Sequence, residues 1–123
     1  MKCLSIRQPF AEDIVNGSKD IENREWPTRY RGPVLIHAGR SPYEGCSRKE
    51  LADLPFGAIV GVAEAIDCAT ESESYWFGGP YGHVLVNRRR FVTPIPWKGE
   101  LGYFDVPDEV VAAAMASSIP VSE

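Results

Sequence analysis

The chain has 123 residues, 44% of them hydrophobic and 11% aromatic, which is the size and composition of one globular domain with a core of its own. Its net charge of −4 argues against sequence-independent coating of nucleic acid, because that mode of binding needs many Lys and Arg contacts to phosphates. No stretch approaches the roughly 18 consecutive apolar residues that cross a bilayer, and the N-terminus lacks the apolar segment of a signal peptide, so we expect a cytoplasmic protein without membrane partners.

The N-terminal segment predicts a short strand followed by a short helix. The run from Lys2 to Arg7 alternates enough for a strand, and Pro9 suits the first turn of a helix because its missing N–H is not needed there. Apolar residues then recur at helical spacing, at Phe10, Ala11, Ile14 and Val15. Gly17 follows the last of them and can adopt the left-handed conformation that closes a helix, so we expect a sharp turn there.

A second strand is expected from Ile21 to Trp26. Alternate residues of a strand share a face, which places Glu22 and Arg24 on the same side, with Asp20 leading them. Lys19 emerges from the turn just before this strand. The segment therefore predicts a cluster of long polar side chains beside the first helix.

Two further polar residues stand near this cluster. Arg7 and Gln8 occupy the junction between the first strand and the helix, where the free N–H groups of a helix N-terminus attract anions. Residues 1–50 carry nine Lys and Arg against seven Asp and Glu, whereas residues 51–123 carry four against ten. The positive charge is concentrated around the cluster, so we expect a basic cleft that recognises a particular end, loop or modified base.

The middle of the chain predicts two strands and one helix. The apolar run from Pro33 to Ala38 is typical of a central strand buried on both faces. A short helix is expected after Ser47, since Ser47 and Glu50 have the spacing of a capping box. The stretch from Ala58 to Cys68 predicts a long strand, in which Gly61 marks a bend or bulge.

Two more strands are expected after an acidic loop. The first runs from His83 to Val92, and its arginines, Arg88 to Arg90, alternate between the faces of the strand. A solvated edge that discourages sheet aggregation is the default interpretation of these arginines, and a phosphate-binding strip is the alternative. The second strand runs from Leu101 to Val106 and closes the sheet.

The C-terminal end predicts one last helix, from about Pro107 to Ala116. Acidic residues in its first turn favour the positive end of the helix dipole. We therefore expect a single domain over residues 1–116, followed by a flexible tail over residues 117–123.

The cysteines indicate neither a disulfide framework nor a zinc site. Cys3, Cys46 and Cys68 are odd in number and form no Cys-x-x-Cys pair. Two of them lie in expected strands, where a reduced, buried thiol is typical. We expect no metal and no cofactor.

The segment after the first helix carries a recognisable motif. Gly17, Lys19, Glu22 and Arg24 stand at the spacing Gly-x-Lys-x-x-Glu-x-Arg. In this motif the chain resembles the ASCH domain family, a branch of the PUA-like folds, and especially its transcription-coactivator type. Four flanking blocks add to the resemblance, namely residues 4–11, 30–38, 56–62 and 94–99.

This resemblance covers roughly residues 3–107 and implies both a fold and a function. The fold is α+β and mainly β, a small bent β-barrel with two to three short helices and a cleft beside the first helix. The function is association with RNA or DNA, or with a nucleotide or modified nucleoside. Lys19, Arg7 and Arg24 would then engage phosphates, while Glu22 and Gln8 would contact a base or hydroxyl edge.

Three more residues are candidates for the same nucleic-acid site, and each has a structural alternative. Trp26 and Tyr81 could stack on a base, although aromatics near Gly and Pro also plug the ends of small barrels. His37 lies inside an apolar strand, where a histidine is more often a hydrogen-bonded core residue. Glu22 and Arg24 could also simply pair and hold the barrel wall together.

Two other functions remain open. Some ASCH relatives are amidohydrolases that use the motif lysine, a threonine nucleophile and a downstream acid, and others are ribonucleases. This chain keeps Lys19 but has Glu22 where the threonine would stand, so a hydrolase here would use Lys19 and Glu22 as its catalytic pair. A protein-interaction role is the third possibility, without a docking groove or heptad pattern to support it.

Overall fold

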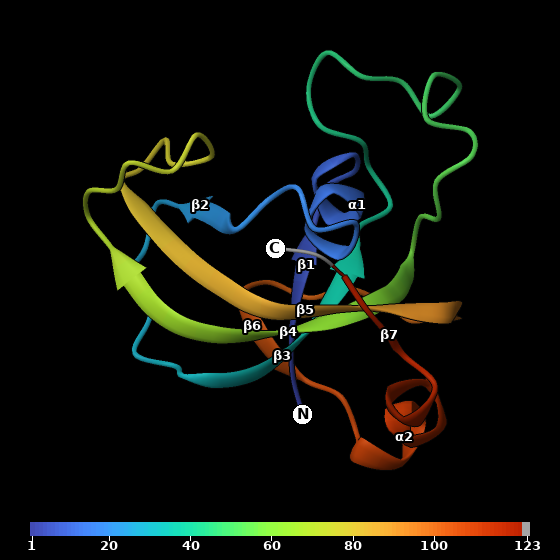
Figure 1. Cartoon of the computed structure of the whole chain (residues 1–123). Coiled ribbons are helices and arrows are strands. Elements are labelled where there is room, and N and C mark those ends of the chain that lie inside the picture. The colour runs from blue at the N-terminus through green and yellow to red at the C-terminus, as the bar shows by residue number, and fades with distance from the viewer. Residues whose placement is uncertain (122–123) are drawn as a thin grey trace.

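The computed structural model describes residues 1–121, which form two helices and seven strands (Figure 1). Their bounds in chain order are β1 Lys2–Ile6, α1 Phe10–Val15, β2 Ile21–Arg24, β3 Gly32–Ala38, β4 Ala58–Ala69, β5 Tyr81–Pro96, β6 Tyr103–Asp105, α2 Asp108–Ala116 and β7 Ile119–Pro120. The expected mainly β class with short helices is confirmed. Within residues 1–121, neither helix has the length and apolar character needed to cross a membrane.

All seven strands belong to one sheet. Six of them follow the order β2-β5-β4-β3-β1-β6, and β7 pairs with β5. β1 runs parallel to β3, while the other pairs are antiparallel. β4 and β5 are long, curved strands, and their pairing contains three register shifts, so the sheet bends into a half-barrel (Figure 1).

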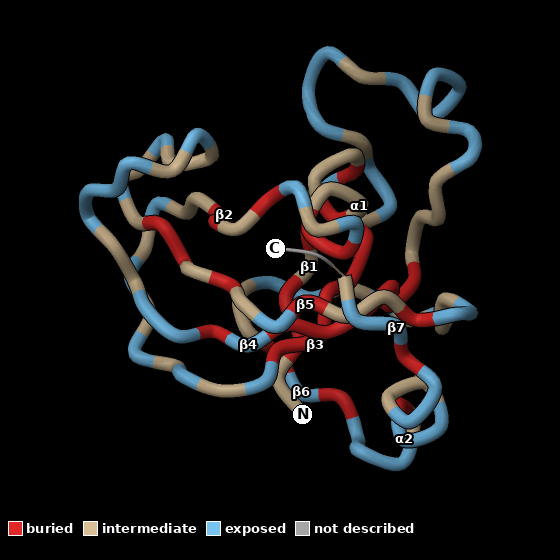
Figure 2. Tube along the Cα trace, in the orientation of Figure 1, coloured by how far each residue is buried: buried red, intermediate tan, exposed pale blue. Residues whose placement is uncertain are grey.

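The sheet buries apolar side chains on both faces, and each face has its own helix. Because strand residues alternate in direction, β3 sends Val34 and Ile36 to the core under α1 and Leu35 to the core under α2. The buried positions gather along the central strands and the inner side of α1 (Figure 2). The expectation that the strand ending at Ala38 is central and buried on both faces is therefore correct.

Gly61 marks a bulge in the middle of β4. The pairing with β5 shifts register between Ile59 and Gly61. A Cβ atom at Gly61 would lie 2.2 Å from the Arg89 carbonyl oxygen and 2.7 Å from Val15 Cγ1. Only glycine lets β5 and α1 approach this closely, which confirms the bend expected there.

The helix expected after Ser47 is absent, and turns take its place. The capping contact does form, since Ser47 Oγ accepts a hydrogen bond from the Glu50 amide at 3.1 Å. Most side chains from residue 41 to residue 53 are exposed, so the segment has no apolar face to pack against the sheet. Local capping without packing does not sustain a helix of this length.

The segment expected as a flexible tail is attached to the sheet as far as residue 121. Ile119 and Pro120 form β7 and pair with Arg90 and Arg89 of β5. The Arg89 guanidinium also donates to Ser118 Oγ and to the Ser118 carbonyl oxygen, both at 2.7 Å. Residues 122–123 of the expected tail lie outside the described residues.

The three consecutive arginines of β5 have structural partners. Arg88 is buried and donates to the Lys19 carbonyl oxygen at 2.6 Å. Arg90 forms a two-pronged contact with the Glu12 carboxylate of α1. With Arg89 bound to Ser118, the run connects β5 to α1, to the turn that holds Lys19 and to the segment before β7, so these guanidiniums do not form the expected solvated edge.

Candidate functional site

The turn after α1 delivers Lys19 to the inside of the molecule. Gly17 has a positive φ of 91°, in the region that glycine adopts without strain. The Lys19 amide then donates to the Asp13 carbonyl oxygen at 2.8 Å, and the Lys19 carbonyl oxygen accepts from Arg88. Both backbone groups of Lys19 are thereby held, which fixes the direction of its side chain.

The Lys19 side chain ends between two aromatic rings. It is 3% exposed, and its Nζ lies 5.0 Å from the centre of the Phe10 ring and 4.8 Å from that of Trp76. Such cation–π contacts partly replace water around the ammonium. Among the described residues, no acceptor lies within hydrogen-bond distance of Nζ, and the nearest carboxylate oxygen, Glu22 Oε1, is 3.8 Å away.

Burial also changes the proton affinity of this amine. Desolvation lowers the pKa of Lys19 from its ordinary value of 10.5, and this effect outweighs the opposing attraction of the Glu22, Asp13 and Asp20 carboxylates. Lys19 is therefore a buried cation without a hydrogen-bond acceptor, and it retains donor capacity for a ligand.

Glu22 and Arg24 form the ion pair that was one of the two interpretations of the motif. The Arg24 Nε and Nη2 atoms lie 3.0 and 2.8 Å from Glu22 Oε2. Arg24 Nη2 also donates to the Ser5 carbonyl oxygen at 2.8 Å, so the pair ties β2 to β1. Both side chains are held in place by these bonds and still line the cleft.

A loop from β4 to β5 closes over the motif. The Asn23 side chain donates to the Trp76 carbonyl oxygen at 2.9 Å and accepts from the amides of Gly78 and Gly79 at 2.9 and 3.1 Å. The Trp76 indole N–H donates to the Ser18 carbonyl oxygen at 2.7 Å. These bonds place the Trp76 ring against Lys19.

These residues surround an open cleft of about 1120 Å³, which we call the motif cleft. Its charged lining is balanced, because four cations face four carboxylates: Arg7, Lys19, Arg24 and Arg40 with Glu22, Glu25, Glu44 and Glu100. Its aromatic lining consists of Phe10, Tyr43, Tyr75 and Trp76. The cleft is thus not net basic as the sequence predicted, since Glu25 beside the motif and Glu44 and Glu100 from other loops add to Glu22.

The structure brings together four of the candidate residues. Lys19, Glu22 and Arg24 line the motif cleft as described, and Arg7 lines it from the end of β1. Arg7 is exposed, and no hydrogen bond or ion pair to another described residue occupies its guanidinium. It is therefore the most accessible of the four.

Gln8 lies apart from this group. It is fully buried, with its Nε2 donating to the Pro55 carbonyl oxygen and its Oε1 accepting from the Glu12 amide, both at 2.9 Å. Its amide thus satisfies the backbone at the start of α1 and does not line the cleft.

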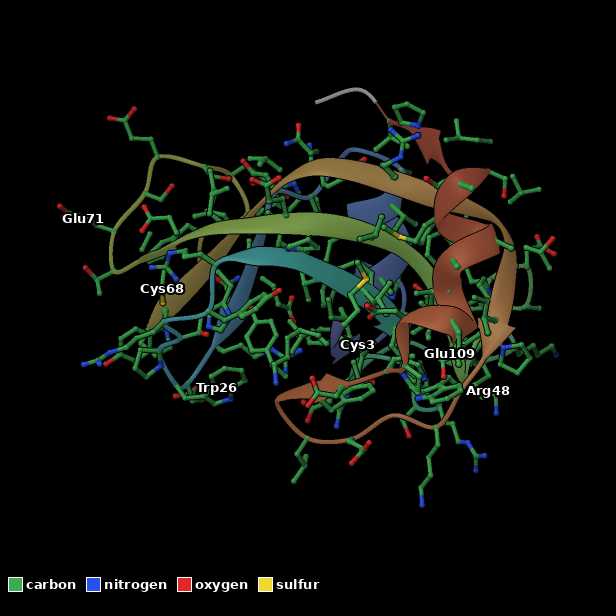
Figure 3. All side chains as sticks on the ribbon, turned by 90° about the horizontal axis from the view of Figure 1, so that it is seen from below. Cys3, Trp26, Arg48, Cys68, Glu71 and Glu109 are labelled. Carbon is green, nitrogen blue, oxygen red and sulfur yellow. The ribbon has the colours of Figure 1, made fainter. Side chains whose placement is uncertain are left out.

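Trp26 and Tyr81 also lie outside the cleft lining. The Trp26 ring packs edge-to-face on His83 and Tyr103, with centroids 4.9 and 5.8 Å apart. Figure 3 shows Trp26 at the same end of the sheet as Cys68. Tyr81 begins β5 opposite Arg24 and is half-buried. The Trp26 ring therefore packs against neighbouring rings and the core.

His37 is a hydrogen-bonded core residue that borders a second opening. It is buried, its Nδ1 lies 2.9 Å from Ser5 Oγ, and its Nε2 lies 2.7 Å from the Trp97 carbonyl oxygen. This opening, which we call the side pocket, measures about 370 Å³. Eight residues line it: Ser5, His37, Gly39, Arg40, Lys98, Gly99, Glu100 and Leu101.

Several cleft residues escaped the sequence analysis. Its helical spacing places Phe10 in the helix core, and Trp76 belongs to the aromatic run of residues 75–77, for which the sequence indicates no role. Asn23 lies within the motif but at one of its variable positions. The signal for Trp76 was its position after an acidic loop and before a Gly-Gly-Pro turn, which is typical of a loop that folds back on a site.

No metal site stands out beside the cleft. No group of three or more His, Cys, Asp or Glu side chains that could hold a metal ion occurs among residues 1–121. All three cysteines are free, with Cys3 buried and the other two half-buried.

The curved sheet, the helix on each face and the cleft beside α1 define a small PUA-like domain. The sequence also matches the model of the ASCH domain over residues 4–108, which is most of the chain. The chain therefore belongs to the ASCH domain family.

Two curated relatives and one solved structure accompany this assignment. The human protein named Activating signal cointegrator 1 is 28% identical over 79% of this chain, and the mouse protein of the same name is 33% identical over 58% of it. The aligned parts span 21% and 15% of those proteins, so the chain corresponds to a fraction of their length. The resemblance to the coactivator type is thereby confirmed.

The solved structure is described as the crystal structure of ASCH from Zymomonas mobilis. It superimposes with a TM-score of 0.63 over 98% of this chain and 97% of that chain, at 16% sequence identity. At this identity the likeness supports the fold alone, which is a half-barrel where the sequence predicted a small bent β-barrel.

Proposed function

We propose that this chain is a nucleic-acid-binding module that accepts one flexible nucleotide unit of RNA, or of single-stranded or flexed DNA, in the motif cleft. Membership of the ASCH family supports the general class. The balanced charge of the cleft favours recognition of a single unit over attraction of a long polyanion, because opposed charges cancel at a distance and act only at contact.

The observation that carries the proposal is the Lys19 ammonium. It is 3% exposed, lies between two rings, and has no hydrogen-bond acceptor among the described residues. A buried cation without such an acceptor is costly, and a ligand oxygen supplied through the cleft would remove that cost. A base carbonyl or a phosphate oxygen at the floor of the cleft meets this need.

Two exposed arginines, Arg7 and Arg40, would make most of the phosphate contacts. Arg24 is committed to Glu22 and to the Ser5 carbonyl oxygen. Arg7 and Arg40 are both exposed and line the cleft. An arginine fork matches phosphate geometry, so these two side chains are placed to hold the backbone on either side of the bound unit.

The rim supplies a stacking surface. Tyr75 is 90% exposed and Tyr43 is 47% exposed, although both line the cleft. Large aromatic side chains held in water next to a polar cleft are typical of base stacking in single-strand binding. The flat faces at the rim and the donor at the floor together fit a base inserted edge-first.

Salt dependence of binding tests this arrangement. For a single strand with two phosphate contacts, the log–log slope of affinity against salt should be about −1.4, and Arg7→Gln should reduce its magnitude by about 0.7. Arg29→Gln is the matched control, since Arg29 is exposed and lines neither opening. A flat salt response, or the same slope change in both variants, would contradict the proposal.

A hydrolase in the same cleft is the second candidate, and the lowered pKa of Lys19 favours it. A lysine that gives up its proton more readily can exchange protons with a substrate. Glu22 is a weaker candidate base than the sequence suggested, because Arg24 holds one of its oxygens through two nitrogens. Proton transfer would therefore depend on Lys19.

Incubation with acylated nucleosides and with labelled RNA separates the two candidates. Turnover by the wild type that is lost in Lys19→Met would identify a hydrolase. Binding without turnover in the wild type, with weakened binding in Lys19→Met, would leave the binding module.

A further inference from the structure

The motif cleft continues into the side pocket. The two openings share five lining residues, Ser5, Gly39, Arg40, Glu100 and Leu101. A strand whose base occupies the cleft would therefore carry its sugar and phosphate past Ser5. The chemistry of Ser5 decides which sugar fits best.

The hydrogen-bond polarity around His37 follows from its two partners. The Trp97 carbonyl oxygen can only accept, so His37 Nε2, 2.7 Å away, carries a proton. Burial lowers the pKa of His37 below its ordinary value of 6.5, which keeps the ring neutral at physiological pH. Nδ1 therefore has a free lone pair and accepts a hydrogen bond from the Ser5 hydroxyl, 2.9 Å away.

This arrangement makes the Ser5 hydroxyl an acceptor toward any ligand. Its single proton is given to His37, and its oxygen has no other hydrogen bond within the described residues. Ser5 lines both openings, and two glycines lie beside its hydroxyl. A Cβ atom at Gly99 would lie 3.0 Å from Ser5 Oγ, and one at Gly39 would lie 3.3 Å from it.

Charges around the side pocket suit a phosphodiester. Arg40 and Lys98 are exposed cations in its lining, and Glu100 is the one carboxylate among its eight lining residues. The excess of one positive charge matches the single negative charge of an internal phosphodiester. A terminal phosphate with nearly two charges would be less well matched.

We propose that the side pocket is a ribose subsite that favours RNA over DNA, in which Ser5 Oγ accepts a hydrogen bond from a 2′-hydroxyl and Arg40 and Lys98 face the adjoining phosphodiester. This inference rests on the proposed function of the motif cleft. A 2′-hydroxyl can donate to an acceptor-only oxygen, whereas the deoxyribose carbon cannot.

Four pools of random pentamers test the donor requirement by fluorescence anisotropy: ribose, deoxyribose with deoxyuridine for thymidine, 2′-fluoro and 2′-O-methyl. The wild type should bind the ribose pool about 3- to 10-fold more tightly than the deoxyribose pool. The 2′-fluoro sugar keeps the pucker of RNA but cannot donate, so its affinity should match that of DNA. Equal affinity for ribose and 2′-fluoro pools would overturn the inference.

The variant Ser5→Ala tests whether the Ser5 hydroxyl causes the preference for ribose. It should lose the preference for ribose while its affinity for the deoxyribose pool stays within about 2-fold of the wild type. Ser117→Ala is the control, because Ser117 is exposed and its hydroxyl donates to the Ala113 carbonyl oxygen of α2, away from both openings. A preference that persists in Ser5→Ala would also overturn the inference, and the 2′-fluoro comparison still decides if that variant does not fold.

The same binding measurements distinguish failure of the ribose subsite from failure of the proposed nucleic-acid-binding function. Equal binding of all four pools would remove the ribose subsite and keep the binding module. Absence of binding to every pool would remove both.

Discussion

Lys19 combines burial, charge and incomplete hydrogen bonding in one side chain. Replacing a buried charge with an apolar side chain of similar length is often neutral or stabilising, by about 1 to 4 kcal/mol. Glu22 keeps its bonds to Arg24 without Lys19, and the half-buried Asp13 loses only the nearby charge of Lys19. We predict that Lys19→Met unfolds in urea with a free energy equal to or above that of the wild type, and binds nucleic acid at least about 10-fold more weakly.

The same comparison has a defined pH dependence. The folded pKa of Lys19 lies below its unfolded value of 10.5, so the unfolded chain holds the extra proton between these two values. Wild-type stability should therefore rise relative to Lys19→Met as the pH approaches 10.5. Urea unfolding of both proteins from pH 7 upward measures this difference, and a constant or widening advantage of the methionine variant would contradict the account.

The three cysteines should differ in reactivity. Cys3 is fully buried, and burial raises the pKa of its thiol to about 12, so little thiolate forms at pH 8. Cys46 and Cys68 are half-buried. We predict that iodoacetamide labels Cys46 and Cys68 in the native protein and leaves Cys3 unlabelled until the chain is denatured, as read by mass spectrometry of peptides. Comparable native labelling of Cys3 would show that β1 is less well covered than described.

The loop before β5 depends on one side chain of β2. Asn23 makes three hydrogen bonds to the segment 76–79. Asn23→Ala should lower the free energy of unfolding by about 1 to 3 kcal/mol, because three loop groups lose their partner. Hydrogen exchange of the peptide that contains Trp76 should speed up, while exchange in β3 should not change.

A control variant tests whether the faster hydrogen exchange of the loop is caused by loss of the Asn23 side chain. Glu25→Ala removes an exposed side chain just beyond the end of β2. Loop exchange in Glu25→Ala should match that of the wild type, and equal acceleration in both variants would rule out a specific role for Asn23.

The close crossing of β4 with its neighbours depends on Gly61. A methyl group there would meet the Arg89 carbonyl oxygen at 2.2 Å, and the backbone of β5 cannot move without breaking the sheet. We predict that Gly61→Ala lowers the unfolding free energy by at least about 2 kcal/mol. Gly78→Ala, whose Cβ would meet only the Asn23 side chain at 3.6 Å and beyond, is the control for thermal and urea unfolding.

Local elements could be predicted from the sequence, and elements that depend on distant packing could not. β1, α1 and β3 follow from periodicity within a few residues. The capping residues of the segment after Ser47 were correctly interpreted, yet no helix forms because that segment packs against nothing. β7 pairs with β5, and beside it Arg89 bonds to Ser118, a contact that spans 29 residues.

At the scale of the whole molecule, the site also has a part that local sequence predicts and a part that depends on distant packing. Lys19, Glu22 and Arg24 lie within one short motif, so the sequence could place them together. Trp76 lies 58 residues after its partner Ser18, and only the path of β4 and β5 brings it to Lys19. Glu100, one of the four acids that balance the cleft, also comes from a distant loop, which the local sequence could not place there.

The sheet itself explains why one surface holds the site. Both of its faces carry packed apolar residues, so the polar groups of the motif can gather only at the curved edge beside α1. There β2 meets the start of β5, and the motif cleft opens between β2, α1 and the loops that follow β3 and β4. Binding should therefore be confined to this edge.

A ¹H–¹⁵N NMR titration with a short ribo-oligonucleotide tests the central claim most directly. The account predicts that the Trp76 indole signal and the amides of residues 19–24 shift first, while signals of α2 and β7 remain unchanged, and that Lys19→Met suppresses these shifts. Shifts centred on α2 and β7, or an unchanged response in Lys19→Met, would contradict it.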